Sequence, residues 1–160
     1  MNLSEQTQGE IIRHFPNIAP SYQNIPNKKV PSLFFAIPMG KKVFMWFTYL
    51  HEKPVCLSLV VTSHNTISSI SCKLASFDEI LCLGTGTILY GTLFTSNNLN
   101  IFTAEDLYSY KGRHVVKRNF QYRFNLLNTI LDTEIQQTIY FKEQVIFSIP
   151  IFHNNYDPII

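Results

Sequence analysis

The chain has 160 residues, of which 46% are hydrophobic and 15% are charged. A disordered protein is therefore excluded, and the length suits one domain with a substantial apolar core. The formal net charge of +2 is too small for a dedicated duplex-DNA binder, although it leaves room for local basic patches.

The three cysteines, Cys56, Cys72 and Cys82, all lie inside apolar runs, as buried thiols do in a reducing compartment. Residues 1–10 lack the basic and apolar regions of a secretory signal. No apolar run approaches the ~20 residues that cross a bilayer. We therefore expect a cytoplasmic protein, in the host cytoplasm or packaged into a virion if the source is viral, with no membrane partner.

The N-terminal part of the chain divides in two. Ser4 can cap a short helix that runs to about Phe15. Four prolines between residues 16 and 31 then forbid regular helix and favour an extended arm. We expect residues 1–31 to form an N-terminal helix and a Pro-rich arm, either a strap across a surface or an ordinary linker. Residues 32–160 are expected to form a single domain.

From Leu33 onward the apolar residues recur with a period of two, which indicates strands. Residues 43–50 are apolar on both faces, so we expect this strand at the centre of a sheet. Residues 55–61 and 67–74 form the next two strands, after the turns HEKP and TSHN. Three successive strands joined by short polar turns predict an antiparallel meander.

Further strands are predicted at residues 79–83, 86–94, 99–103, 135–141 and 145–151, with TSNN as a hairpin turn. One strong helix lies among them: Asn119 can cap it, and apolar residues follow at helical spacing as far as Leu131. The predicted fold class is α+β, mainly an antiparallel β-sheet (meander) with one long helix near residues 119–131 and a short N-terminal helix.

The sequence contains no complete catalytic or metal-binding motif. The five histidines are isolated and lack zinc-ligand spacing, and no G-x-S-x-G elbow marks a serine nucleophile. The glycine-rich run LGTGTILYGT has neither the lysine nor the following helix of a P-loop, which favours a β-bulge or a close strand approach. Glu105 and Asp106 are neighbours on a strand and point to opposite faces, so capping or ion pairing is favoured over a catalytic pair. We expect no enzymatic activity, no cofactor and no metal.

A strand, a hairpin strand and a helix follow one another between Phe77 and Leu131. Their sequences are ILYGTLF (Ile88–Phe94), IFTAEDLYSYKG (Ile101–Gly112) and NFQYRFNLLNTIL (Asn119–Leu131). In order and spacing they resemble the middle of the covalent nucleotidyltransferases, the group that contains mRNA capping guanylyltransferases and ATP-dependent ligases. In that family a strand with an Asp-Gly-Glu-like motif precedes a strand reading Phe-x-x-x-Asp-x-Leu, an aromatic-Gly turn and a helix bearing Arg and Leu.

The family's reaction uses the lysine of a Lys-x-Asp-Gly motif, which attacks the α-phosphate. Here KKVFMWFTYL offers Lys41 and Lys42 but has aromatic residues in place of Asp and Gly, and Tyr90-Gly91-Thr92 replaces the acidic residue that would hold the ribose. The resemblance thus implies a degenerate, catalytically inactive relative that serves as a binding or scaffold module in viral transcription or mRNA capping. The alternative is a structural or assembly protein of a large DNA virus particle with no nucleotide role. The resemblance, together with a composition rich in residues of A/T-rich codons, suggests that viral source.

The only basic run lies in the loop before the predicted helix and consists of Lys111, Arg113, His114, Lys117 and Arg118. Because the apolar residues of that helix are committed to the core, we expect the loop to project outward. These five residues are predicted to bind a partner or a polyanion, with a simple solvated loop as the alternative. We expect a protein partner, and RNA or a nucleotide as a further ligand, while the oligomeric state is unknown from the sequence.

Overall fold

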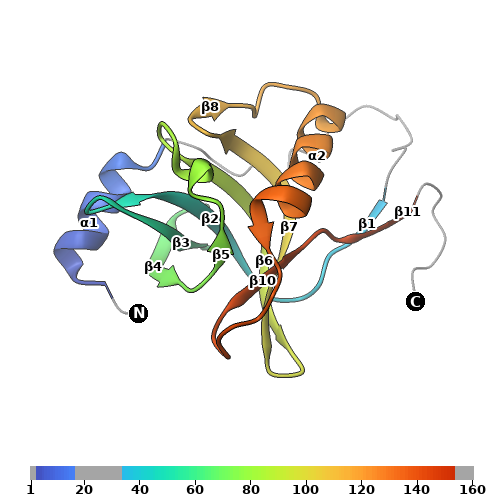
Figure 1. The fold of residues 1–160 in the computed structure, drawn as a ribbon, viewed down its shortest axis with the longest axis horizontal. Helices are drawn as coiled ribbons and strands as arrows, with labels where there is room; N and C mark the ends of the chain where they lie inside the picture. Colours follow the sequence, from blue (N-terminus) through green and yellow to red (C-terminus); the bar gives the residue numbers. More distant parts are fainter. Residues whose placement is uncertain (1–2, 17–33, 154–160) are drawn as a thin grey trace.

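The structure is a computed structural model that describes residues 3–16 and 34–153, and one large sheet forms most of it (Figure 1). The strands of this sheet are β2 (Lys41–Leu50), β3 (Lys53–Val61), β4 (Ile67–Lys73), β6 (Thr87–Ser96), β7 (Leu99–Tyr110), β8 (Arg113–His114) and β10 (Val145–Ser148). Two short strand pairs lie outside it: β1 (Phe34–Ala36) with β11 (Ile151–His153), and β5 (Ser76–Phe77) with β9 (Ile135–Gln136). The helical segments are α1 (Glu5–His14), the 3-10 turn η1 (Glu79–Cys82), α2 (Phe120–Thr129) and the π-helical turn η2 (Ile130–Glu134).

The fold class is α+β and mainly antiparallel, as predicted. The strand order is β4-β3-β2-β6-β7-β10, with β8 paired to the end of β7. The predicted meander is therefore confirmed as β2, β3 and β4. The hairpin between β6 and β7 turns through Asn97 and Asn98, both with positive φ, a conformation that asparagine tolerates in two-residue turns.

Both helices begin where the sequence predicts. The Ser4 hydroxyl accepts a hydrogen bond from the Thr7 N–H, and the Asn119 side chain accepts one from the Tyr122 N–H. The second helix continues through η2 to residue 134, slightly beyond the predicted end. Most of the predicted Pro-rich arm, from residue 17 on, lies outside the described residues.

The central strand β2 is buried on both faces, as its apolar pattern predicts. Its side chains alternate between two apolar clusters, Val43, Met45 and Phe47 in one and Phe44 and Trp46 in the other. Leu127 of α2 belongs to the first cluster and Ile11 of α1 to the second. The two helices therefore cover opposite faces of the sheet.

The N-terminal helix is packed onto the sheet. Ile11 is 3% exposed, and the Phe15 ring lies 5.3 Å from the rings of both Phe44 and Trp46. Leu3 packs against the same cluster. Helix α1 thus contributes to the core of this face, although it offers only a few apolar residues in sequence.

Two predicted strands differ in the structure. Residues 79–83 form η1 instead of a strand, because the Asp78 carboxylate accepts the Ile80 N–H and starts a helical turn. The strand predicted at 135–141 shortens to β9, because the buried Gln144 side chain bonds the backbone of Thr138 and Tyr140 and shapes a loop there. The last sheet strand, β10, runs parallel to β7, since α2 lies between them in sequence and acts as a crossover.

Strand β7 carries two β-bulges opposite β6. Leu89 pairs with Leu107 while Ile88 pairs with Ser109, which leaves Tyr108 as an extra residue. A second register shift between Tyr90 and Gly91 leaves Glu105 extra. A bulge re-aims side chains and increases twist, so the two bulges set the directions of the acidic pair Glu105 and Asp106.

Candidate functional site

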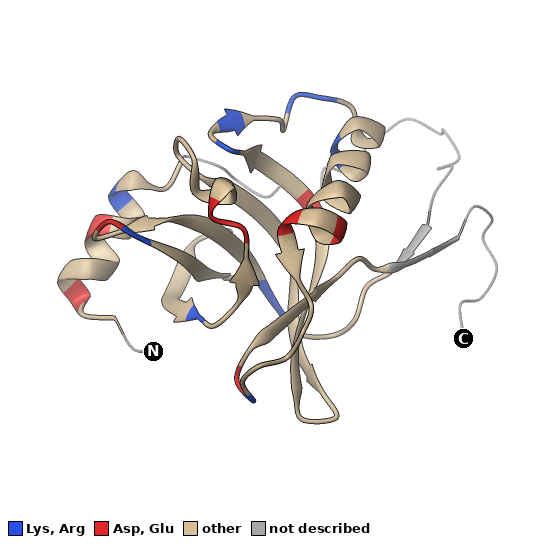
Figure 2. Ribbon diagram, viewed as in Figure 1, with Lys and Arg blue, Asp and Glu red and all other residues tan. Residues whose placement is uncertain are grey.

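The predicted basic run lies at one end of the molecule, between β7 and α2 (Figure 2). It begins in a tight turn in which Lys111 and Gly112 have φ of 51° and 85°. A Cβ on Gly112 would approach the Cα of Gly84 to 3.1 Å, and the Gly112 N–H donates to the Gly86 carbonyl. The turn therefore packs closely against the loop before β6 and needs glycine at its second position.

Lys111, the first residue of the run, is held by the protein itself. Its ammonium lies 3.1 Å from the Glu134 carboxylate, and the Tyr110 hydroxyl donates to the same oxygen of Glu134. Its interactions with Tyr110 and Glu134 raise the pKa of Lys111, so the side chain stays charged. Lys111 is therefore committed to a cluster in which Glu134 is mostly buried.

The other four predicted residues are exposed, and the loop that bears them is anchored at two points. Val115 is buried, and the His114 ring shares a 3.0 Å hydrogen bond with the Ser109 hydroxyl. The Arg118 guanidinium lies 4.1 Å from the centre of the Tyr122 ring. In the part of the chain that the structure describes, no carboxylate lies within 4.0 Å of a cationic nitrogen of Arg113, Lys117 or Arg118.

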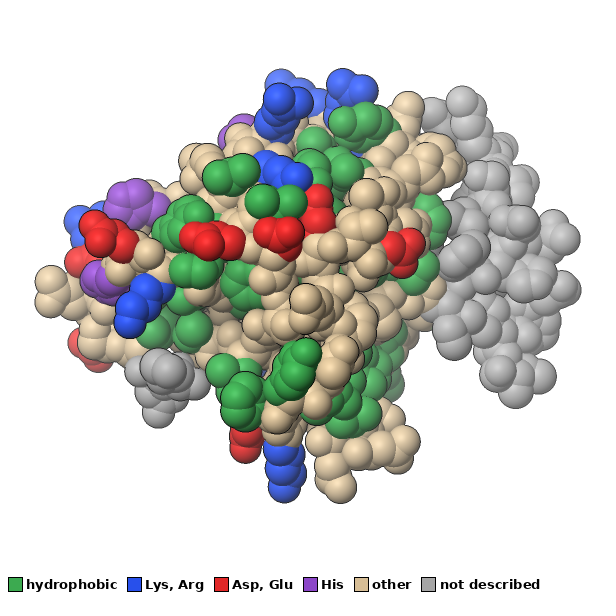
Figure 3. All heavy atoms as spheres, in the orientation of Figure 1, with side chains coloured by type: hydrophobic (Ala, Val, Ile, Leu, Met, Phe, Trp, Pro, Cys, Tyr) green, Lys and Arg blue, Asp and Glu red, His purple; other side chains and the backbone are tan. Residues whose placement is uncertain are grey.

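The surface view shows the same arrangement (Figure 3). Lysine and arginine side chains gather at the top of this face, where the ribbon of Figure 2 places β8 and the segment leading into α2. We define the basic edge as Arg113, Lys117 and Arg118, the exposed cations of this segment. It presents positive charge on a short, anchored loop.

Lys42, one of the two lysines that the sequence resemblance singled out, pairs with side chains of strands β6 and β7. Its ammonium lies 3.0 and 3.1 Å from the two carboxylate oxygens of Glu105 and donates to the Thr92 hydroxyl at 2.7 Å. The Glu105 side chain is 9% exposed and that of Lys42 is 32% exposed. A lysine held in this way is engaged by Glu105 and Thr92 within the sheet and is poorly placed to attack a phosphate.

Asp106, the neighbour of Glu105, has different partners. The Asp106 carboxylate accepts the N–H of Leu107 and forms an ion pair with Arg123, 3.4 Å away, without hydrogen-bond geometry. Burial raises the pKa of Asp106, with a smaller contribution of the same sign from Glu105, while Arg123 lowers it. The roles in ion pairs expected of Glu105 and Asp106 are thus present in the structure.

None of the thiols has the environment of a nucleophile. Burial raises the pKa of Cys56 and Cys72 and raises that of Cys82 to about 11. A raised pKa leaves little thiolate at neutral pH. These cysteines act as apolar side chains, as their sequence context predicts.

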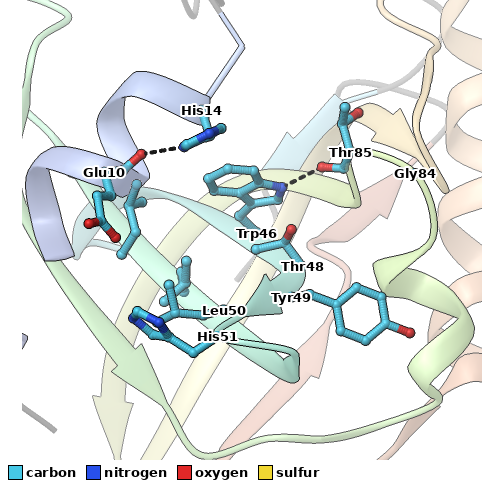
Figure 4. A pocket seen from close by; sticks show the side chains of 11 residues that line it. Glu10, His14, Trp46, Thr48, Tyr49, Leu50, His51, Gly84 and Thr85 are labelled. Carbon is cyan, nitrogen blue, oxygen red and sulfur yellow. Dashed lines mark hydrogen bonds between the residues drawn. The ribbon is translucent and has the colours of Figure 1, made fainter.

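A cavity of about 370 Å³ lies between α1 and the sheet (Figure 4). Its walls come from α1, from β2 and the turn after it, from β3 and from the loop at Gly84 and Thr85. Trp46 lies at its centre in Figure 4, and its indole N–H donates to the Thr85 carbonyl at 2.8 Å. Sequence reasoning missed this site, because its residues are scattered along the chain and form no motif.

Two further observations and the comparisons bear on function. Among the described residues, no three His, Cys, Asp or Glu side chains lie close enough to hold a metal ion, and no helix has the length and apolar character to span a membrane. The sequence matches no protein-family model, and the curated proteins give no match either.

Proposed function

We propose that the protein is a non-catalytic binding module that holds an acidic protein partner at its basic edge. The observation that carries this proposal is the set of exposed cations Arg113, Lys117 and Arg118, which have no carboxylate partner among the described residues. Cations neutralised within the fold contribute little to association, whereas unneutralised ones attract an acidic surface.

The anchoring of the basic edge supports a binding role. Val115 fixes the middle of the loop in the core, and Arg123 of α2 donates to the Val116 carbonyl at 3.2 Å. A loop held in this way loses little conformational entropy when a partner binds. The exposed Tyr122 under Arg118 adds a flat apolar surface beside the charge.

The state of Lys42 supports the absence of nucleotidyl transfer. A covalent intermediate would need an amine that is free to attack the α-phosphate, but the Lys42 amino group is paired with Glu105 and bonded to Thr92. The proposed origin, a degenerate nucleotidyltransferase-like module of viral transcription or capping machinery, rests on the sequence resemblance of residues 77–131.

The binding proposal is tested by charge reversal. Arg113, Lys117 and Arg118 are changed to Glu, and a matched control changes Lys41, Lys53 and Lys142, which are also exposed, to Glu. Binding of a fluorescent poly-glutamate peptide and of a single-stranded RNA oligonucleotide is measured by anisotropy at low and physiological salt. We expect the peptide to bind the parent protein and the basic-edge variant to lose about tenfold or more in affinity, while the control changes much less.

Three outcomes would count against this proposal. The peptide could fail to bind, the control could lose as much affinity as the basic-edge variant, or the RNA could bind more tightly than the peptide. The last result would replace the acidic protein by a nucleic acid as the partner. Thermal unfolding of each variant checks that the fold is intact, because surface charges typically change stability by less than about 1 kcal/mol.

The proposed absence of nucleotidyl transfer is tested separately. The protein is incubated with labelled GTP or ATP and a divalent metal and then run on a denaturing gel. We expect an unlabelled protein band, because the Lys42 amino group is engaged by Glu105 and Thr92. A labelled band that disappears in Lys42→Ala would contradict the proposal.

One observation favours the second candidate, an assembly subunit of a virus particle. Tyr140 and Phe141 are 63% and 61% exposed on a loop that the buried Gln144 holds in shape. Large apolar side chains on an ordered loop are typical of subunit interfaces. If the chain assembles in analytical ultracentrifugation and Tyr140→Ser with Phe141→Ser abolishes assembly, this candidate is preferred.

A further inference from the structure

The cavity between α1 and the sheet has a mainly apolar interior. Ile11 of α1, Leu50 of β2 and Leu57 of β3 line it together with Trp46. Its volume of about 370 Å³ falls in the range of sites that hold small organic molecules. An apolar interior of this size favours a ligand with an aliphatic or aromatic body.

Most polar groups around the cavity already have partners within the protein. The Trp46 indole N–H donates to Thr85, the His14 ring donates to the Glu10 carbonyl at 2.8 Å, and the Tyr49 hydroxyl donates to Glu79. These bonds hold the side chains that line the cavity in place. They also leave few groups to recognise the polar part of a ligand.

The Glu10 carboxylate differs from these groups. Glu10 is partly buried, and its carboxylate has no hydrogen bond or ion pair with any other described residue. It is the one side chain with a formal charge at neutral pH, histidines counted as neutral, among the residues that line the cavity. In Figure 4 it extends from α1 on the same side of Trp46 as His51.

The carboxylate of Glu10 favours a ligand with a positive charge. The carboxylate of a partly buried residue beside an apolar wall attracts a cation, and a hydrogen bond to a charged group contributes more than one between neutral groups. An anion would be repelled by Glu10, and a neutral ligand would leave the carboxylate without a charged partner. The indole of Trp46 adds an aromatic surface, which also favours a cation.

We propose that this cavity binds an organic cation with an apolar body, whose ammonium or guanidinium group pairs with Glu10. The cation comes either from a free amine or from an arginine side chain of a peptide. The site is separate from the basic edge, since the two share no residue.

Trp46 makes the site directly measurable, because it is the only tryptophan in the chain. Its fluorescence is followed during titration with three compounds of similar shape: 2-phenylethylamine, 2-phenylethanol and 3-phenylpropionate. N-acetylarginine amide represents the peptide source. The titrations are repeated with Glu10→Gln and with the control Glu5→Gln, which changes an exposed carboxylate of α1 that does not line the cavity.

We expect a saturable change with the amine or the arginine derivative, and affinity about tenfold or more lower for the alcohol and for Glu10→Gln. Glu5→Gln should bind like the parent protein. The tighter of the two cations identifies the source. The proposal is overturned if neither cation gives a saturable change, if the alcohol binds as well as the amine, or if a folded Glu10→Gln keeps full affinity. Should Glu10→Gln fail to fold, the affinity order of the three compounds on the parent protein decides.

Discussion

The ammonium of Lys42 lies 3.0 Å from the carboxylate of Glu105, although their strands, β2 and β7, are not neighbours in the sheet. Thr92, on the intervening strand β6, accepts a hydrogen bond from Lys42 and donates one to Glu105. The β-bulge at Glu105 accompanies this arrangement. The three side chains therefore tie three strands together and hold a nearly buried carboxylate.

Removal of Lys42 should be costly for stability. Lys42→Ala leaves the Glu105 carboxylate, 9% exposed, without its cation, and we expect a loss of about 1–3 kcal/mol in the free energy of unfolding. Lys41→Ala is the control, because this neighbouring lysine is exposed, and it should change stability by less than about 0.5 kcal/mol. Urea unfolding of the two variants makes the comparison. Equal stabilities would mean that the ion pair contributes nothing to the fold.

The packing of α1 on the sheet is tested by two adjacent isoleucines. Ile11 is 3% exposed and Ile12 is 50% exposed. Ile11→Ala should lower the free energy of unfolding by about 2–4 kcal/mol, because it removes buried methyl groups and leaves a cavity. Ile12→Ala should stay within about 0.5 kcal/mol of the parent protein. If both variants unfold at the same urea concentration as the parent, the helix does not contribute to the core.

Two glycines should respond in opposite directions to alanine. A Cβ at Gly91 would lie 2.0 Å from the Thr103 carbonyl oxygen, so β6 and β7 would have to separate, and we expect a loss of about 1–3 kcal/mol or more. Gly9, inside α1, has nothing within 4 Å of the same atom, and Gly9→Ala should add about 0.5–1 kcal/mol by favouring the helix. Thermal unfolding of both variants measures the contrast. A stable Gly91→Ala would show that the two strands are not closely packed there.

The pH dependence of the protein's stability should reflect the titration of the Asp106 carboxylate. Burial raises its pKa in the folded state above the ordinary 3.8, so the folded protein binds this proton more tightly than the unfolded chain does. Stability from this group is therefore present below pH 3.8 and falls as the pH rises through the raised pKa. Asp106→Asn removes the titration, and the variant should gain in melting temperature relative to the parent across that window. The attraction of Arg123 acts only on the ionised carboxylate and is already part of the net upward shift in the pKa of Asp106. A difference that does not vary with pH would contradict the raised pKa.

Local patterns predicted much of this fold. The caps Ser4 and Asn119 act through side-chain bonds to the next turn, and the alternation in β2 reflects burial on both faces. Both signals depend on neighbours in the chain and need no tertiary information. Prediction failed at residues 135–141, where the buried side chain of Gln144 bonds the backbone of Thr138 and Tyr140 and shapes a loop in place of most of the strand.

Signals carried by neighbouring residues can be read from the sequence, whereas contacts between residues far apart in the chain cannot. The sequence by itself determined the α+β class, the meander, both helix starts and the position of the basic run, because contiguous residues carry each of these signals. Only the tertiary structure decided that Lys111 pairs with Glu134, that Lys42 reaches Glu105 across β6, and that α1 and β2 enclose a cavity beside Glu10. These relations join residues far apart in the chain, and the packing of the two faces of the sheet, with its bulges and crossover, brings them together.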